Sequence, residues 1–181
     1  LVFDRLTAPI AIRGASAGVS RLVFAGCSGP QFNFVQHGYQ QPAGLDLCDL
    51  SLAARGVAGT ALSVNYGTPQ VTNDHYRPSI TMDRCRVESS DSGWWASGLD
   101  LADARNVSLS NLHLSGGAQG GNRNALTGAA LKLRRMCVNT HLANVRGAFW
   151  HTGLECHADG GDNPHAHNPE GIFASNCSFV A

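Results

Sequence analysis

Short alternations of apolar and polar residues, each interrupted once by a step out of phase, recur along this chain. In the segment VSLSNLHL at 107–114, Val107 and Leu109 alternate with serines, and the alternation resumes one position out of phase at Leu112, directly after Asn111. Because successive side chains of a strand point to opposite faces, one continuous strand would turn its second half to the other face. The pattern therefore predicts two short strands joined by a bend at Asn111.

The same eight-residue pattern occurs five times, with small or apolar residues at its first, third, sixth and eighth positions in nearly every copy. The copies are LDLCDLSL at 45–52, ITMDRCRV at 80–87, VSLSNLHL at 107–114, VNTHLANV at 138–145 and IFASNCSF at 172–179. The fifth position, where the bend is expected, holds Asp49, Arg84, Asn111, Leu142 and Asn176. Asp and Asn tolerate left-handed backbone conformations and suit such a bend. We therefore predict one structural repeat with connecting loops of variable length.

A second short alternation follows each of the first four octets. These segments are ALSV at 61–64, GLDL at 98–101, ALKL at 130–133 and GLEC at 153–156. Three short strands per repeat without helical periodicity predict an all-β fold, a right-handed parallel β-helix with three short strands in each coil. A β-sandwich also has many short strands, but it does not repeat one octet with a bend at a fixed position. The residues expected inside are Leu47, Ile80, Met82, Val107, Leu109, Val138 and Ile172.

Length and composition restrict the possibilities further. The 181 residues suit a single domain, with first coils at 1–40 and regular coils at 41–181, and we expect a piece of a longer chain because a bare last coil would expose its apolar stack. The formal net charge is zero and no long apolar run occurs, so we expect neither a nucleic-acid partner nor membrane insertion. Several of the six cysteines fall at inward positions, which predicts buried thiols and no disulfides.

The segments VSLSNLHLSG, GIFASNCSFVA and GLDLCDLSLAARG resemble the coils of the pectate-lyase-like superfamily, and within it the tailspikes and tail-associated depolymerases of bacteriophages. The resemblance covers roughly residues 40 to 181. It implies a homotrimer on the virion, in contact with other tail proteins, that binds or cleaves a bacterial surface polysaccharide. It leaves open a non-catalytic virion protein and a secreted microbial polysaccharide lyase, hydrolase or epimerase. The signatures of polygalacturonases and pectate lyases are absent, so the catalytic type stays open, and we expect no cofactor.

Charged residues gather on the outward positions of the third strands. If those strands stack in register, about 4.8 Å apart, one column runs Ser63, Asp100, Lys132, Glu155 and the next runs Asn65, Ala102, Arg134, His157. Asp100 and Glu155 would lie roughly 9 to 10 Å apart, near the upper limit of the spacing in inverting glycosidases. Lys132 between them could hold both carboxylates ionised or serve a lyase as base. We predict these three as catalytic, against the alternative of a charge ladder that only stabilises the sheet.

Four residues near this face are predicted to bind substrate: Trp94, Trp95, Arg134 and His157. The tryptophans are expected in the loop before the face, where they could stack on sugar rings or instead cover the core or meet a neighbouring subunit. The segment 157–168 gathers three histidines and two aspartates, but their spacing matches no defined zinc motif. We therefore predict no metal site.

Overall fold

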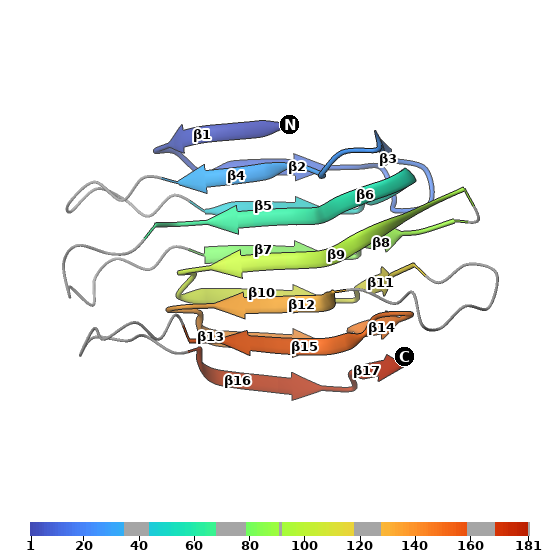
Figure 1. The fold of residues 1–181 in the computed structure, drawn as a ribbon. Coiled ribbons are helices and arrows are strands. Elements are labelled where there is room, and N and C mark those ends of the chain that lie inside the picture. Colours follow the sequence, from blue (N-terminus) through green and yellow to red (C-terminus); the bar gives the residue numbers. More distant parts are fainter. Residues whose placement is uncertain (35–43, 68–78, 91, 118–127, 159–168, 181) are drawn as a thin grey trace.

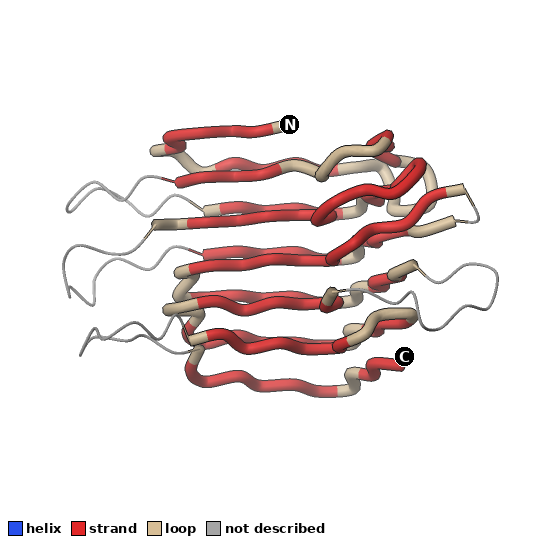
Figure 2. Tube along the Cα trace, in the orientation of Figure 1, coloured by secondary structure: helices blue, strands red, loops and turns tan. Residues whose placement is uncertain are grey.

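The described residues form seventeen strands and no helix. The structure is a computed structural model that describes residues 1–34, 44–67, 79–90, 92–117, 128–158 and 169–180. Figures 1 and 2 show the strands lying in successive layers, with the two termini at opposite ends of the stack. The strands are β1 (Val2–Leu6), β2 (Ile10–Arg13), β3 (Arg21–Ala25), β4 (Gln31–Phe34), β5 (Leu45–Cys48), β6 (Ser51–Asn65), β7 (Ser79–Asp83), β8 (Arg86–Glu88), β9 (Gly93–Ala102), β10 (Asn106–Ser110), β11 (His113–Ser115), β12 (Ala129–Arg134), β13 (Val138–Ala143), β14 (Arg146–Ala148), β15 (Thr152–His157), β16 (Glu170–Ser175) and β17 (Ser178–Val180).

The bend inside the repeats is a single residue in the left-handed conformation. Asn111, with φ of 53°, separates β10 from β11, so that Leu109 and Leu114 point into the same core. Equivalent positive φ angles occur at the predicted bends Asp49, Arg84 and Asn176. The predicted bend of the fourth copy is wrong. It lies at Asn144, with φ of 56°, two residues beyond Leu142.

Hydrogen bonding groups the strands into two sheets. One sheet has six strands in the order β16-β13-β10-β7-β5-β2, and the other has eleven, with the path β15-β12-β9-β6-β8-β11-β14-β17 and with β1, β3 and β4 attached beside it. Every pairing between named strands is parallel. The all-β class and the parallel pairing of the repeats are therefore correct.

The more specific fold class, a right-handed parallel β-helix with three separate short strands in each coil, is contradicted. The strands make two parallel sheets rather than three, because β6 is one continuous strand of 15 residues. Its first part, from Ser51 to Arg55, pairs with β3 and β8, while its later part pairs with β4 and β9. The ten residues of β9 likewise run without a break alongside both Val57 and Ser63 of β6. Long strands thus join what the sequence pattern had separated.

One apolar cluster fills the space between the two sheets. The six-stranded sheet contributes Leu47, Met82 and Leu109, which are paired in register from β5 to β7 to β10, and all are at most 2% exposed. The eleven-stranded sheet contributes a second such row, Leu62, Leu99 and Leu131, each fully buried. Identical or similar residues stacked on successive strands explain why the repeat is visible in the sequence.

The predicted interior is correct at Leu47, Ile80, Met82, Val107 and Leu109, which are all buried. Ile172 is partly buried and packs against the core, so its predicted inward position is correct. Val138 is also partly buried but is not part of the core cluster, so its predicted inward position is wrong. Both lie on β13 and β16, the strands at one end of the six-stranded sheet, and fully buried Thr140 takes the inward position that was assigned to Val138.

The cysteines differ in environment. Cys85 and Cys137 are buried, and burial raises the pKa of each thiol to about 11. Cys177 is partly buried, but Cys156, also expected inside, is exposed. All six cysteines are free thiols.

A Asn111→Val variant should lose about 2 to 3 kcal/mol of folding free energy, because a β-branched side chain is strained at positive φ and the amide hydrogen bonds of Asn111 are lost. Asn111→Gly is the matched control: it removes the same hydrogen bonds but accepts the left-handed backbone, so it should lose less. Urea unfolding measures both. Equal losses in the two variants would show that the bend does not require this backbone conformation.

Candidate functional site

The two predicted columns of outward residues exist in the structure. Lys132 of β12 pairs in register with Asp100 of β9 and with Glu155 of β15, and Asp100 pairs with Ser63 of β6. The second column likewise joins Asn65, Ala102, Arg134 and His157 across the same four strands. The columns lie on the eleven-stranded sheet, where β6, β9 and β12 are paired on both sides and β15 is an edge strand. This arrangement makes the face a regular array of polar side chains.

Both predicted catalytic carboxylates are neutralised by neighbouring cations. Arg134 Nε donates to Asp100 Oδ1 at 2.6 Å, which joins the two columns one strand apart. Lys132 Nζ lies 3.4 Å from Glu155 Oε1, and His157 Nε2 also contacts that oxygen. Lys132 therefore forms an ion pair with Glu155, and Asp100 forms a separate one with Arg134. All of these side chains are between 22% and 45% exposed, so a ligand could reach them.

The pKa of Glu155 is lowered from its ordinary value. The hydrogen bond with His157 is the largest cause, and the charge of Lys132 acts in the same direction against partial desolvation. Glu155 is therefore ionised at neutral pH, whereas the general acid of a glycosidase needs a raised pKa. Because the folded pKa is depressed, the interaction stabilises the fold above the ordinary glutamate pKa and is lost as the pH falls through the lowered value.

The two tryptophans lie in β9 rather than in a loop, which corrects their predicted placement. Trp95 is fully buried, packs against Phe24 with ring centroids 5.8 Å apart, and donates its indole N–H to the carbonyl of Glu88 at 3.1 Å. Neither face of its ring is therefore accessible to a sugar. Trp94 points the other way and is partly exposed, and a Cβ on Gly117 would lie 2.2 Å from the Cβ of Trp94, so that glycine leaves room for the tryptophan.

A buried ion pair at the end of the columns was not expected from the sequence. Arg135 Nη2 lies 2.6 Å from Asp103 Oδ2, and the carboxylate side chain is fully buried. Arg135 also donates to Asn65 Oδ1 at 2.7 Å, which connects the pair to the second column. Asp103 and Arg135 directly follow the paired residues Ala102 and Arg134, so their common register position was a usable signal. Both have positive φ angles, 60° and 56°.

An exposed aromatic pair on the other sheet was also missed. His141 of β13 and Phe173 of β16 are register partners, and their rings stack with centroids 4.9 Å apart and an interplanar angle of 17°. Phe173 is 55% exposed. A flat exposed ring of this kind can pack against the apolar face of a sugar.

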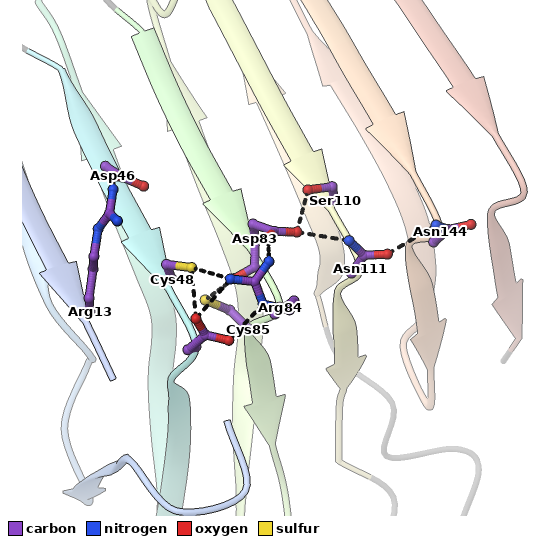
Figure 3. Close-up of polar contacts among 10 residues, drawn as sticks. Arg13, Asp46, Cys48, Asp83, Arg84, Cys85, Ser110, Asn111 and Asn144 are labelled. Atoms are coloured by element: carbon purple, nitrogen blue, oxygen red, sulfur yellow. Dashed lines mark hydrogen bonds and ion pairs between the residues drawn. The ribbon is translucent and has the colours of Figure 1, made fainter. Parts of the chain in front are cut away.

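The bends form a polar ladder along one edge of the repeats (Figure 3). Arg84 holds Asp49 through two hydrogen bonds of 2.7 and 2.8 Å, and these bonds, with one from Cys48, lower the pKa of Asp49 to about 2. Asn111 donates to Asp83 Oδ1 at 2.8 Å, and Asn144 donates to Asn111 at 3.0 Å. The side chains at successive bends are thus fixed by one another.

Within the described residues, no group of three or more His, Cys, Asp or Glu side chains is arranged to hold a metal ion. The histidine-rich segment considered in the sequence lies mostly at 159–168, outside the described residues. The described part of the chain contains no helix of the length and apolarity that a membrane span requires. The chain matches no protein family model, no curated protein and no solved structure.

Proposed function

We propose that this protein binds a bacterial surface polysaccharide, as part of a phage tailspike or tail-associated protein. The observation that carries the proposal is the pair of in-register polar columns on β6, β9, β12 and β15. The sequence resemblance of the octets to tailspike repeats supports the viral assignment, the homotrimer and the contact with other tail proteins.

Regular columns of this kind suit a polymer. Strands held in a sheet repeat their side chains at about 4.8 Å, so successive hydrogen-bonding groups lie along a line that a chain of sugars can follow. The groups offered are mixed: Lys132 and Arg134 donate, Asp100 and Glu155 accept, and Ser63 does both. Because ion pairs fix the ends of these side chains, little conformational freedom is lost when a ligand binds.

Binding without cleavage is the form that the site chemistry favours. Asp100 accepts from Arg134, and the lowered pKa of Glu155 opposes service as a general acid. The second candidate function is depolymerisation by an inverting hydrolase. It is favoured by one observation: Asp100 and Glu155 lie two strands apart on either side of Lys132, which corresponds to roughly 9 to 10 Å.

Incubation of the full chain with capsule or lipopolysaccharide from candidate hosts distinguishes the two functions. We expect retention on the immobilised glycan without new reducing ends and without the absorbance of unsaturated uronates. New reducing ends alone would indicate a hydrolase, and both signals a lyase. Either result would overturn the proposal of binding without cleavage. If cleavage occurs, Asp100→Asn and Glu155→Gln test whether these carboxylates are responsible.

Lys132→Gln and Arg134→Gln should each weaken binding to a glycan that the protein retains by about tenfold, because each removes charged donors from the columns. Arg13→Gln is the matched control, since Arg13 also pairs with an aspartate, Asp46, but lies on the six-stranded sheet. It should leave the affinity unchanged. Surface plasmon resonance on the immobilised glycan measures all three, and equal effects of the three substitutions would place the binding site elsewhere.

Light scattering of the full-length protein tests the proposed assembly. A trimer is expected for a tailspike, and a clean monomer would favour a free, secreted polysaccharide-active protein instead.

A further inference from the structure

An open groove lies along the bends and shares no lining residue with the polar columns. Its volume is about 920 Å³, and it is lined by residues of the bends and of the short strands that follow them. Asn111 and Asn144 contribute amides from the bend ladder, and Arg86, His113 and Arg146 contribute side chains from β8, β11 and β14. Figure 3 shows the bend side of this region, where the side chains of Arg84, Asn111 and Asn144 follow one another across successive strands.

Three basic residues of the groove form one column. His113 pairs in register with Arg86 on one side and with Arg146 on the other, so two arginines and a histidine occupy three consecutive strands about 4.8 Å apart. All three side chains are exposed. The other register partners of Arg86 and Arg146 are Ser51 and Ser178, so no cross-strand ion pair accounts for this arrangement.

Other arginines near the groove have acidic partners, unlike the two arginines in this column. Arg13, Arg21 and Arg84 pair with Asp46, Glu88 and Asp49 respectively. In the part of the chain that the structure describes, Arg86 and Arg146 have no acidic partner. The single acidic residue among the described groove residues is Asp49, and Arg84 already holds it. The groove therefore carries a net positive charge in a chain whose formal net charge is zero.

We propose that this groove binds an acidic polysaccharide, with its carboxylate, sulfate or phosphate groups along Arg86, His113 and Arg146. Arginine forks suit such oxyanions, and the amides of Asn111 and Asn144 suit sugar hydroxyls. A nucleic acid fits less well, because no Phe, Tyr or Trp side chain, the larger rings on which bases stack, is among the described groove residues. The site is separate from the polar columns and does not depend on the function proposed for them.

The test uses the full chain and polymers of defined charge. Isothermal titration calorimetry should detect binding of hyaluronan, a uronate polymer, and of dextran sulfate, but not of uncharged dextran. Binding should weaken as salt is raised, because exposed charges are screened. Binding of dextran as tight as that of dextran sulfate, or tighter binding of single-stranded poly(dT) than of hyaluronan, would overturn the proposal.

The double variant Arg86→Ser with Arg146→Ser should lose at least about tenfold in affinity for hyaluronan. Arg55→Ser is the matched control, because Arg55 is also an exposed arginine but lies outside the groove, so its loss should change the affinity by less than about twofold. The double variant should unfold at about the same temperature as the parent, because neither exposed arginine makes an ion pair within the described part of the chain. Unchanged affinity in a folded double variant would sink the proposal. Lys132→Gln keeps the groove intact, so hyaluronan binding that depends on Lys132 and not on the arginines would assign the ligand to the columns.

Discussion

A Leu109→Asp variant should fail to reach a cooperatively folded state. Leu109 is fully buried and lies between Met82 of β7 and Leu142 of β13, its register partners in the middle of the six-stranded sheet. An ionised carboxylate at this position has no cation or donor within the apolar row, and its burial costs about as much as the whole stability of a domain. Circular dichroism during thermal or urea unfolding should therefore show no cooperative transition, and the protein should aggregate.

Ser108→Asp is the control, one residue away on the same strand. Ser108 is exposed because alternate residues of β10 point outward, so the same new charge should change stability by less than about 0.5 kcal/mol. Leu109→Ala gives an intermediate measure and should lose about 2 to 5 kcal/mol through the cavity that it leaves. A folded, cooperative Leu109→Asp protein would show that this row is not the core of the molecule.

The sequence was sufficient for the layers that repeat and insufficient for the connections between them. Asn111 and Leu109 could be placed because the bend and the inward positions recur at fixed places in the octet. In contrast, no hydrophobic pattern distinguishes a strand that ends near Arg55 from one that continues through Gly56. Both place the same side chains inside, and only backbone hydrogen bonds decide that β6 is continuous. The fold class was wrong for that reason.

The fourth octet shows how hydrophobicity can mislead the register. The octet was set to begin at Val138, which put the bend at Leu142 and both Val138 and Thr140 at inward positions. The backbone requirement at the bend was the stronger signal, since Asn144 aligns with Asn111 and Asn176 in the ladder. A register chosen from the bend residue first would have begun the octet at Thr140, which pairs with Val107 and is fully buried.

The candidate site, like the fold, could be predicted from the sequence only in part. Strand register placed Lys132 beside Asp100 and Glu155, which the alternation could predict. The choice of partner within the columns could not be predicted, because it depends on side-chain reach. The guanidinium of Arg134 extends diagonally to Asp100 on the preceding strand, and the lysine turns to the following one. That choice is what makes the face an array of neutralised pairs and weakens the case for catalysis.

The buried pair of Asp103 and Arg135 is expected to have the largest electrostatic effect on stability. An Asp103→Asn variant keeps the shape of the side chain and its tolerance of positive φ, but it removes the charge that faces Arg135. We expect a loss of about 2 to 4 kcal/mol of folding free energy. This is at the lower end of the range for a buried ion pair that loses one partner, because Arg135 is 23% exposed and its unpaired charge can be solvated in part.

An exposed pair of the same residue types supplies the comparison. Asp46 pairs with Arg13 at 2.6 Å, but the arginine side chain is 69% exposed, so Asp46→Asn should cost less than about 1 kcal/mol. The double variant Asp103→Asn with Arg135→Gln should recover at least about 1 kcal/mol relative to the sum of the two single losses, because the uncompensated charge is gone. Urea unfolding of the four variants and the parent measures these differences. If Asp103→Asn loses no more than Asp46→Asn, the buried carboxylate contributes nothing to stability beyond what a surface ion pair contributes.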